Sequence, residues 1–275
     1  MPDYDYKMIG VTLHDDYVAT VELQNGPFNF FDMQMISELG DAFHALDEDK
    51  RCRAIVLCAD GKAFSAGANF GDGSNKNAPI AGVEPEGDEN ESAFRRSSGR
   101  LYGEAVRLFQ NKKPIVGAIE GPAIGGGLGL ALVPDFRVSC KEAKFATNFS
   151  LLGIHPGFGL TYTLPALIGK QHAHKMFFVG HRIDGVEAKE IGLIDTLVER
   201  ADVRHAAHAL AVQIATAAPL AVISIRETVR AGLADQVRAA TQRELQEQEW
   251  LVETEDAHEG MQAVAERRPG QFKSA

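Results

Sequence analysis

Three consecutive glycines, Gly125 to Gly127, stand between a short apolar run and an apolar segment that Pro134 and Asp135 end. Each glycine loses more backbone freedom on folding than alanine would, so three at a helix start are costly unless something must approach the main chain closely. Peptide N–H groups at a helix start carry partial positive charge. The triplet therefore indicates a place where the backbone holds a group that is anionic or becomes so.

A second stretch that could take part in chemistry runs from Lys62 to Phe70 and reads KAFSAGANF. It follows Ala54 to Cys58, an apolar run that suits a buried strand, and Asp60-Gly61 ends that strand. A serine-hydrolase elbow is one alternative for this stretch, but the GxSxG pattern needs glycine where Ala63 stands.

The triplet has two alternative explanations. In a dinucleotide-binding GxGxxG fingerprint, the third glycine would fall on Leu130 or Leu132, so the spacing fails. A tight strand-to-helix crossover, whose glycines only relieve crowding, stays open on the triplet alone.

Both stretches resemble the crotonase (enoyl-CoA hydratase/isomerase) superfamily. Its members carry a pattern like KP-apolar-apolar-A-x-x-G-x-A-x-GGG-x-x-L-apolar-apolar-x-x-D, which Lys113 to Asp135 match almost throughout. They also carry a similar K-A-F-x-A-G-A-D loop, which the present loop matches except that Asn69 replaces the aspartate. A closing segment, Glu259 to Pro269, resembles the family's EGM-x-A-F-x-E-K-R-x-P, so the resemblance spans roughly Val18 to Phe272.

The resemblance implies an α/β fold with a crotonase-type β/α spiral core over residues 1–200. It implies a C-terminal all-helical region over residues 201–275 that packs across subunits, and hence a homotrimer or a dimer of trimers. Strands that alternate with helices in the first two thirds, followed by helices only, independently support that division.

The resemblance also implies the chemistry. An acyl-CoA thioester would hold its carbonyl oxygen between the backbone N–H groups of Ala68 and Gly126, which stabilise an enolate without reorganising. The remaining predicted binding residues are small or basic: Lys62, Ala63, Ala66, Gly67, Arg267 and Arg268. Lys62 and the two arginines are candidates for binding the phosphates of coenzyme A. The substrate itself brings coenzyme A, so we expect neither a permanently bound cofactor nor a metal.

The sequence departs from the family's pattern at the acid/base positions. Hydratases of the family carry one glutamate two residues after the triplet and a second after the following strand, and here these positions are Gly129 and Phe149. Relatives with a catalytic aspartate in the Pro-Gly turn would need it at Gly157 or Phe158, and neither residue can titrate.

His155 is the nearest remaining ionisable residue in sequence. A histidine beside a Pro-Gly turn could act as a base near neutral pH. The alternative is a histidine bonded to nearby backbone.

Three functions are therefore open. The first is an acyl-CoA lyase or isomerase of the enoyl-CoA hydratase/isomerase type, active in fatty acid metabolism, for which hydration and other reactions both stay open. The second is a catalytically weak acyl-CoA-binding protein that keeps the fold, and the third is a homologue that cleaves a C–C or thioester bond.

Composition excludes several other classes. The 275 residues carry a net charge of −10, which argues against nucleic acid as a partner. The Met1 to Gly10 segment has no apolar core of a secretory signal, and the longest uncharged apolar stretch, Gly121 to Val133, is too short to span a bilayer. The three cysteines lack metal-site spacing, so we expect a cytoplasmic protein without a membrane partner.

The patterns of apolar residues predict the elements that position these motifs. Asp32 is a plausible N-cap for the first helix. The predicted strands are Met8 to Leu13, Val18 to Leu23, Ala54 to Cys58, Pro114 to Ile119, Phe136 to Ser139, Lys144 to Thr147 and Ile194 to Val198. Helices are predicted over Phe94 to Gln110, over Leu164 to Gly180 and throughout the chain after Ala201, and a long mobile loop over Gly71 to Gly99.

Overall fold

A computed structural model describes residues 4–68, residue 86 and residues 91–275. Most of the predicted loop, Gly71 to Gly99, falls outside the described residues. Its last residues do not form a loop, because helix α2 already begins at Ala93, where the Ser92 hydroxyl accepts the N–H of Arg95. That side-chain cap ends the loop earlier than composition suggested.

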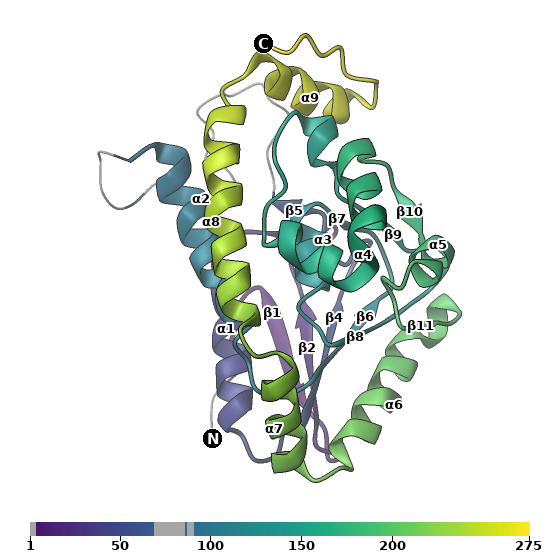
Figure 1. The fold of residues 1–275 in the computed structure, drawn as a ribbon. Coiled ribbons are helices and arrows are strands. Elements are labelled where there is room, and N and C mark those ends of the chain that lie inside the picture. Colours follow the sequence, from purple (N-terminus) through teal and green to yellow (C-terminus); the bar gives the residue numbers. More distant parts are fainter. Residues whose placement is uncertain (1–3, 69–85, 87–90) are drawn as a thin grey trace.

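A six-stranded sheet with the order β1-β2-β4-β6-β8-β11 forms the centre of the molecule (Figure 1). The first two strands form the predicted antiparallel hairpin, and every later neighbour is parallel. The strands are Ile9–Leu13, Val18–Leu23, Ala54–Ala59, Ile115–Ile119, Phe136–Ser139 and Thr196–Leu197.

The last strand is shorter than predicted. The N–H groups of Leu193 and Ile194 bond the carbonyl of Ala188 at the end of helix α5, Gly185–Glu190, instead of joining the sheet. Apolar residues at this position therefore close a helix before the strand begins.

Two small sheets lie at one end of the large one. The first has the order β10-β9-β7, with strands Ile183–Asp184, Lys144–Ala146 and Ala123–Ile124. The second pairs β3, Phe30–Phe31, with β5, Gly67–Ala68. These short pairings hold the loop after β4 and the turn before the glycine triplet at the same end of the molecule (Figure 1).

Helices surround this core. Helix α1, Met33–Glu48, begins where Asp32 accepts the N–H of Met35, as predicted. The other helices of the core are α2 at Ala93–Arg107, α3 at Gly126–Ala131, the 3₁₀ helix η2 at Asn148–Leu152, and α4 at Leu160–Val179.

Helix α4 begins four residues before the predicted start at Leu164, and a tertiary contact explains the difference. Its N-cap, Gly159, offers no side chain, and the buried carboxylate of Glu244 instead accepts the N–H groups of Gly159 and Thr161 at 2.7 and 2.8 Å. Because Glu244 lies 85 residues away from Gly159 along the chain, local sequence patterns cannot show this cap.

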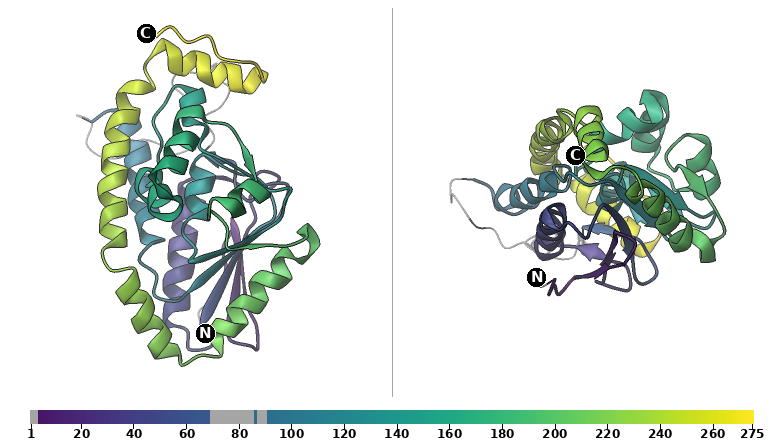
Figure 2. Two further views of the ribbon diagram at one scale, coloured as in Figure 1. Left: turned by 45° about the vertical axis from the view of Figure 1, so that its right-hand side comes forward. Right: turned by 90° about the horizontal axis from the view of Figure 1, so that it is seen from below.

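After the last strand the chain is helical. Helix α8 packs beside α2, and α9 packs on η2 (Figures 1 and 2). The helices are η3 at Arg200–Asp202, α6 at Val203–Ala215, α7 at Pro219–Val229, α8 at Leu233–Leu251 and α9 at Glu255–Glu266. No single helix in the described part of the chain is long and apolar enough to cross a membrane. The helix pair Arg200–Ala215 and Pro219–Val229, which is bent by 106°, reaches the needed length and apolar composition only when its two members are taken together.

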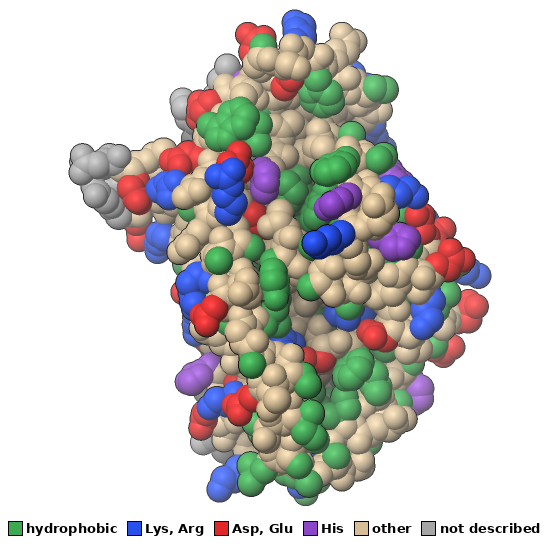
Figure 3. Space-filling model, viewed as in Figure 1, with side chains coloured by type: hydrophobic (Ala, Val, Ile, Leu, Met, Phe, Trp, Pro, Cys, Tyr) green, Lys and Arg blue, Asp and Glu red, His purple; other side chains and the backbone are tan. Residues whose placement is uncertain are grey.

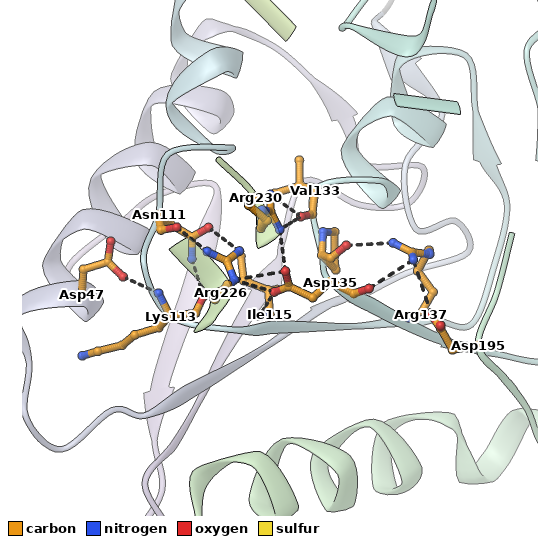
Figure 4. A network of polar contacts seen from close by, with 11 residues as sticks. Asp47, Asn111, Lys113, Ile115, Val133, Asp135, Arg137, Asp195, Arg226 and Arg230 are labelled. Atoms are coloured by element: carbon orange, nitrogen blue, oxygen red, sulfur yellow. Dashed lines mark hydrogen bonds and ion pairs between the residues drawn. The ribbon is translucent and has the colours of Figure 1, made fainter. Parts of the chain in front are cut away.

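A buried polar network joins α7 to the core (Figure 4). Asp135 accepts from Arg226 at 2.8 Å and from Arg230 at 2.7 Å, and its carboxylate also accepts the N–H of Ile115. Arg226 further donates to the backbone and side chain of Asn111. The residue that ends the glycine-triplet motif therefore anchors the C-terminal helices.

Candidate active site

The two chemically suggestive stretches meet. Ser65 forms a parallel bridge with Ala123, and the Ser65 carbonyl accepts the N–H of Ile124 at 3.0 Å. A Cβ added to Gly127 would lie 2.1 Å from the Ser65 carbonyl oxygen, and one added to Gly67 would lie 2.8 Å from the Ile124 carbonyl oxygen. Both positions require glycine because the two backbones touch there.

A cavity of about 190 Å³ opens where the two stretches meet. Four of the predicted residues that handle the thioester line it together: Ala66, Gly67, Ala68 and Gly126. The other lining residues are Phe30, Gly125, Asn148, Phe149, Leu152, Met261, Val264 and Ala265.

The backbone at the triplet is fixed from several sides. The N–H of Gly125 donates to the Ala146 carbonyl at 2.9 Å, continuing the pairing of β7 with β9. Gly126 is the first residue of α3, so its N–H has no carbonyl one turn earlier in the helix to bond. A Cβ on Gly126 would lie 2.6 Å from the buried Phe31 ring, so a larger residue would require that ring to move.

Apolar groups occupy the surroundings of Gly129 and Phe149. A Cβ on Gly129 would lie 2.8 Å from Phe158, whose ring packs 5.2 Å from that of Phe31, centre to centre. Phe149 is itself buried and forms part of the cavity wall. Within the described residues, the cavity lining has no ionisable side chain.

Comparisons with known proteins agree with this geometry. The family model described as enoyl-CoA hydratase/isomerase matches residues 14–275. The chain belongs to the enoyl-CoA hydratase/isomerase family. It is 31% identical over 260 residues to a probable enoyl-CoA hydratase of Bacillus subtilis, covering 94% of this chain and 96% of that protein. It is 30% identical over 261 residues to a carnitinyl-CoA dehydratase of Citrobacter koseri, covering 93% of this chain and 95% of that protein.

The fold is also that of the enoyl-CoA hydratase/isomerase family. The crystal structure of an enoyl-CoA hydratase/isomerase from Pseudoalteromonas atlantica superposes with a TM-score of 0.80 at 24% identity, covering 97% of this chain and 100% of that one. The expected α/β crotonase fold with C-terminal helices is therefore confirmed.

His155 does not line the cavity of this family member. Its Nδ1 lies 2.8 Å from the Pro156 carbonyl oxygen, and its own carbonyl accepts from Gln248. The Oε1 of Gln248 in turn accepts from the Tyr102 hydroxyl at 2.6 Å, and burial raises the pKa of Tyr102. The geometry matches the alternative of a histidine bonded to nearby backbone.

The remaining predicted binding residues lie outside the cavity wall. Lys62 is exposed, and Ala63 is buried with its carbonyl accepting from Asn29 at 2.9 Å. Arg267 is exposed at the end of α9, whereas Arg268 pairs with Glu259 and Glu266.

Sequence reasoning did not place Leu152 or the α9 residues in the cavity wall, whereas Asn148, whose amide could orient a water but cannot take a proton, was a candidate. Met261, Val264 and Ala265 recur at helical spacing, which predicts an apolar face but not what that face contacts. Asn148 directly precedes Phe149, and this position next to a family motif residue is what indicates from the sequence that Asn148 lies near the site.

Proposed function

We propose that the protein binds an acyl-CoA thioester with its carbonyl oxygen between the backbone N–H groups of Ala68 and Gly126, and that it acts on substrates through the enolate so stabilised. The single observation that carries the proposal is the meeting of the two stretches at one cavity, with Gly67 and Gly127 pressed against the opposite backbone. The names of the relatives, a hydratase and a dehydratase of CoA thioesters, support the substrate class.

A backbone site of this kind suits enolate chemistry. Negative charge develops on the thioester oxygen, and donors that are already fixed stabilise it without a reorganisation cost. Gly126 lies at the positive end of α3, although a helix of six residues adds little dipole. Each such donor contributes about 10²–10³ in rate.

Ordinary hydration fits the cavity poorly. Addition of water needs a group that takes and gives protons, typically worth about 10²–10⁴ in rate. The resemblance aligns Gly129 and Phe149 with the glutamates of hydratases, and Phe158 fills the space beside Gly129. We therefore propose a lyase or isomerase reaction other than hydration, or cleavage of a C–C or thioester bond, with its proton-transfer group unassigned.

Calorimetric titration tests the binding step. Short and medium acyl-CoA thioesters should bind saturably, while free coenzyme A should bind more weakly because it lacks the thioester oxygen. Gly67→Val should abolish binding, because a side chain there meets the Ile124 carbonyl. Gly103→Ala on α2, where an added Cβ has open space, is the matched control. Absence of heat with every thioester at millimolar concentration would overturn the proposal.

A second candidate is a catalytically weak acyl-CoA-binding protein. The observation in its favour is that, within the described residues, no ionisable side chain lines the cavity. Mass spectrometry of acyl-CoA mixtures after long incubation with the protein separates the two candidates. If the wild type converts a thioester and Gly67→Val does not, the protein is an enzyme. If the wild type binds thioesters saturably without converting any of them, it is a binding protein.

A further inference from the structure

Asn148 stands apart from the other residues of the cavity wall. Every other lining residue is a glycine or has a hydrocarbon, aromatic or thioether side chain. The Asn148 side chain makes no hydrogen bond to another described residue, although it is partly buried. A partly buried amide without a partner loses free energy that a ligand able to bond it would restore.

The backbone holds this amide in a defined place. Asn148 opens η2 two residues after Ala146, whose carbonyl is bonded to the N–H of Gly125. The Oδ1 atom of Asn148 lies 3.3 Å from the position that a Cβ on Gly125 would take, and the Phe149 ring lies 3.6 Å from the same point. The amide and the ring therefore flank Gly125 at the cavity wall.

This location relates the amide to one part of a bound acyl group. Gly125 directly precedes Gly126, and consecutive Cα atoms lie about 3.8 Å apart. A thioester oxygen bonded to the N–H of Gly126 would lie about 2.9 Å from that nitrogen. The amide thus lies in the cavity wall next to the place of the thioester. Because C2 becomes part of the enolate, C3 is the first carbon beyond it that can carry a further oxygen.

We infer that Asn148 is a specificity residue, and that it selects acyl-CoA thioesters with a hydroxyl or carbonyl oxygen at C3 over hydrocarbon chains of the same length. The inference rests on the proposed function, since it takes an acyl-CoA as the ligand. An amide donates to a carbonyl through its NH₂ group and either donates to or accepts from a hydroxyl. A hydrocarbon chain would instead bury the amide without a partner, at a cost that corresponds to about 10- to 100-fold in affinity.

Calorimetry with three four-carbon ligands tests the inference: butyryl-CoA, 3-hydroxybutyryl-CoA and 3-oxobutyryl-CoA. In the wild type, the two oxygenated ligands should bind at least about tenfold more tightly than butyryl-CoA. Asn148→Leu, which has nearly the same volume, should remove the difference and bind butyryl-CoA more tightly than the wild type does, because no amide is then buried without a partner. Ser150→Ala, on the exposed side of the same 3₁₀ helix, is the matched control and should keep the difference.

The outcomes distinguish this inference from the proposed function. Equal affinity of the wild type for all three ligands would overturn the role of Asn148 while leaving acyl-CoA binding in place. A preference that survives in Asn148→Leu would also overturn it. Binding of none of the three would overturn the proposed function itself. If Asn148→Leu does not fold, Asn148→Ala, which adds no volume, gives the same comparison.

Discussion

At the scale of single residues, the proposed departure from hydratase chemistry rests on Gly129 and Phe149, which the resemblance aligns with the glutamates of hydratases. We predict that the wild type hydrates crotonyl-CoA very slowly, because neither residue can transfer a proton. Loss of absorbance of the conjugated thioester measures the rate. Turnover within tenfold of an ordinary enzyme's roughly 10 s⁻¹ would contradict the prediction, and a large loss in His155→Ala would then identify the replacement base.

The structure also determines at which of these two positions a glutamate can be introduced without displacing a neighbouring side chain. Phe149 is buried but borders the cavity, so a glutamate of similar length at this position can direct its carboxylate into the cavity. Gly129→Glu must instead displace Phe158, because even a Cβ would lie 2.8 Å from its ring. Phe149→Glu is therefore the variant in which to look for gained hydration, and Gly129→Glu is expected to fold poorly.

The sequence indicated the close backbone approach of the two stretches, because glycine and alanine spacing reports such contacts, while the backbone donors of the site stay a prediction. It could not predict Phe158 beside Gly129 or Asn148 beside Gly125, since both contacts join residues that are distant in the chain. The resemblance identified the family correctly, while the positions of Lys62 and Arg267 outside the cavity wall depend on packing that no motif encodes.

At the scale of elements, Glu244 on α8 links the C-terminal region to the start of α4. Its carboxylate accepts from Gly159 and from both the N–H and the hydroxyl of Thr161, yet burial outweighs these bonds and raises its pKa. A carboxyl with a raised pKa in the folded state stabilises the fold below the pKa of the unfolded chain, about 4.3. That contribution is lost as the pH rises through the folded pKa.

We therefore predict that the wild type loses stability relative to Glu244→Gln as the pH rises above about 4.5, because glutamine does not titrate. Urea unfolding of both proteins at several pH values between 5 and 8 measures the difference in free energy of unfolding. The exposed Glu253→Gln on the turn after α8 is the control and should show a constant difference. A difference between the wild type and Glu244→Gln that is constant or grows with pH would refute the role assigned to Glu244.

The network around Asp135 gives a second prediction at this scale. Burial alone would raise the pKa of Asp135, but Arg226 and Arg230 outweigh it and lower the pKa. Arg226→Ala would leave the buried carboxylate half paired, at a cost of about 3–5 kcal/mol in free energy of unfolding. Arg238→Ala, which removes an exposed pair with Asp235, should cost at most about 1 kcal/mol. Equal costs in urea unfolding would show that the network does not hold α7 to the core.

At the scale of the whole molecule, the C-terminal helices leave an apolar surface exposed. Figure 3 shows hydrophobic side chains gathered over the lower end of the molecule, where α6 and α7 lie. On α7, Leu220, Ile225 and Val229 are 81%, 63% and 76% exposed, and Arg226 is the one buried residue of the helix. A helix that exposes several large apolar side chains to solvent indicates a surface that another chain covers.

We predict that this surface is part of a homotrimer, or of a dimer of trimers, because the resemblance places the C-terminal helices between subunits. Light scattering should give about three or six times the chain mass of 29.8 kDa. Leu220→Asp combined with Val229→Asp should shift the protein toward the monomer, because each carboxylate would have to be buried without a partner. Val186→Asp, at an exposed apolar position on α5, controls for the added charge and should leave the mass unchanged. A wild-type monomer at working concentration would refute the trimer, and a trimer that survives the double substitution would place the contact on another face.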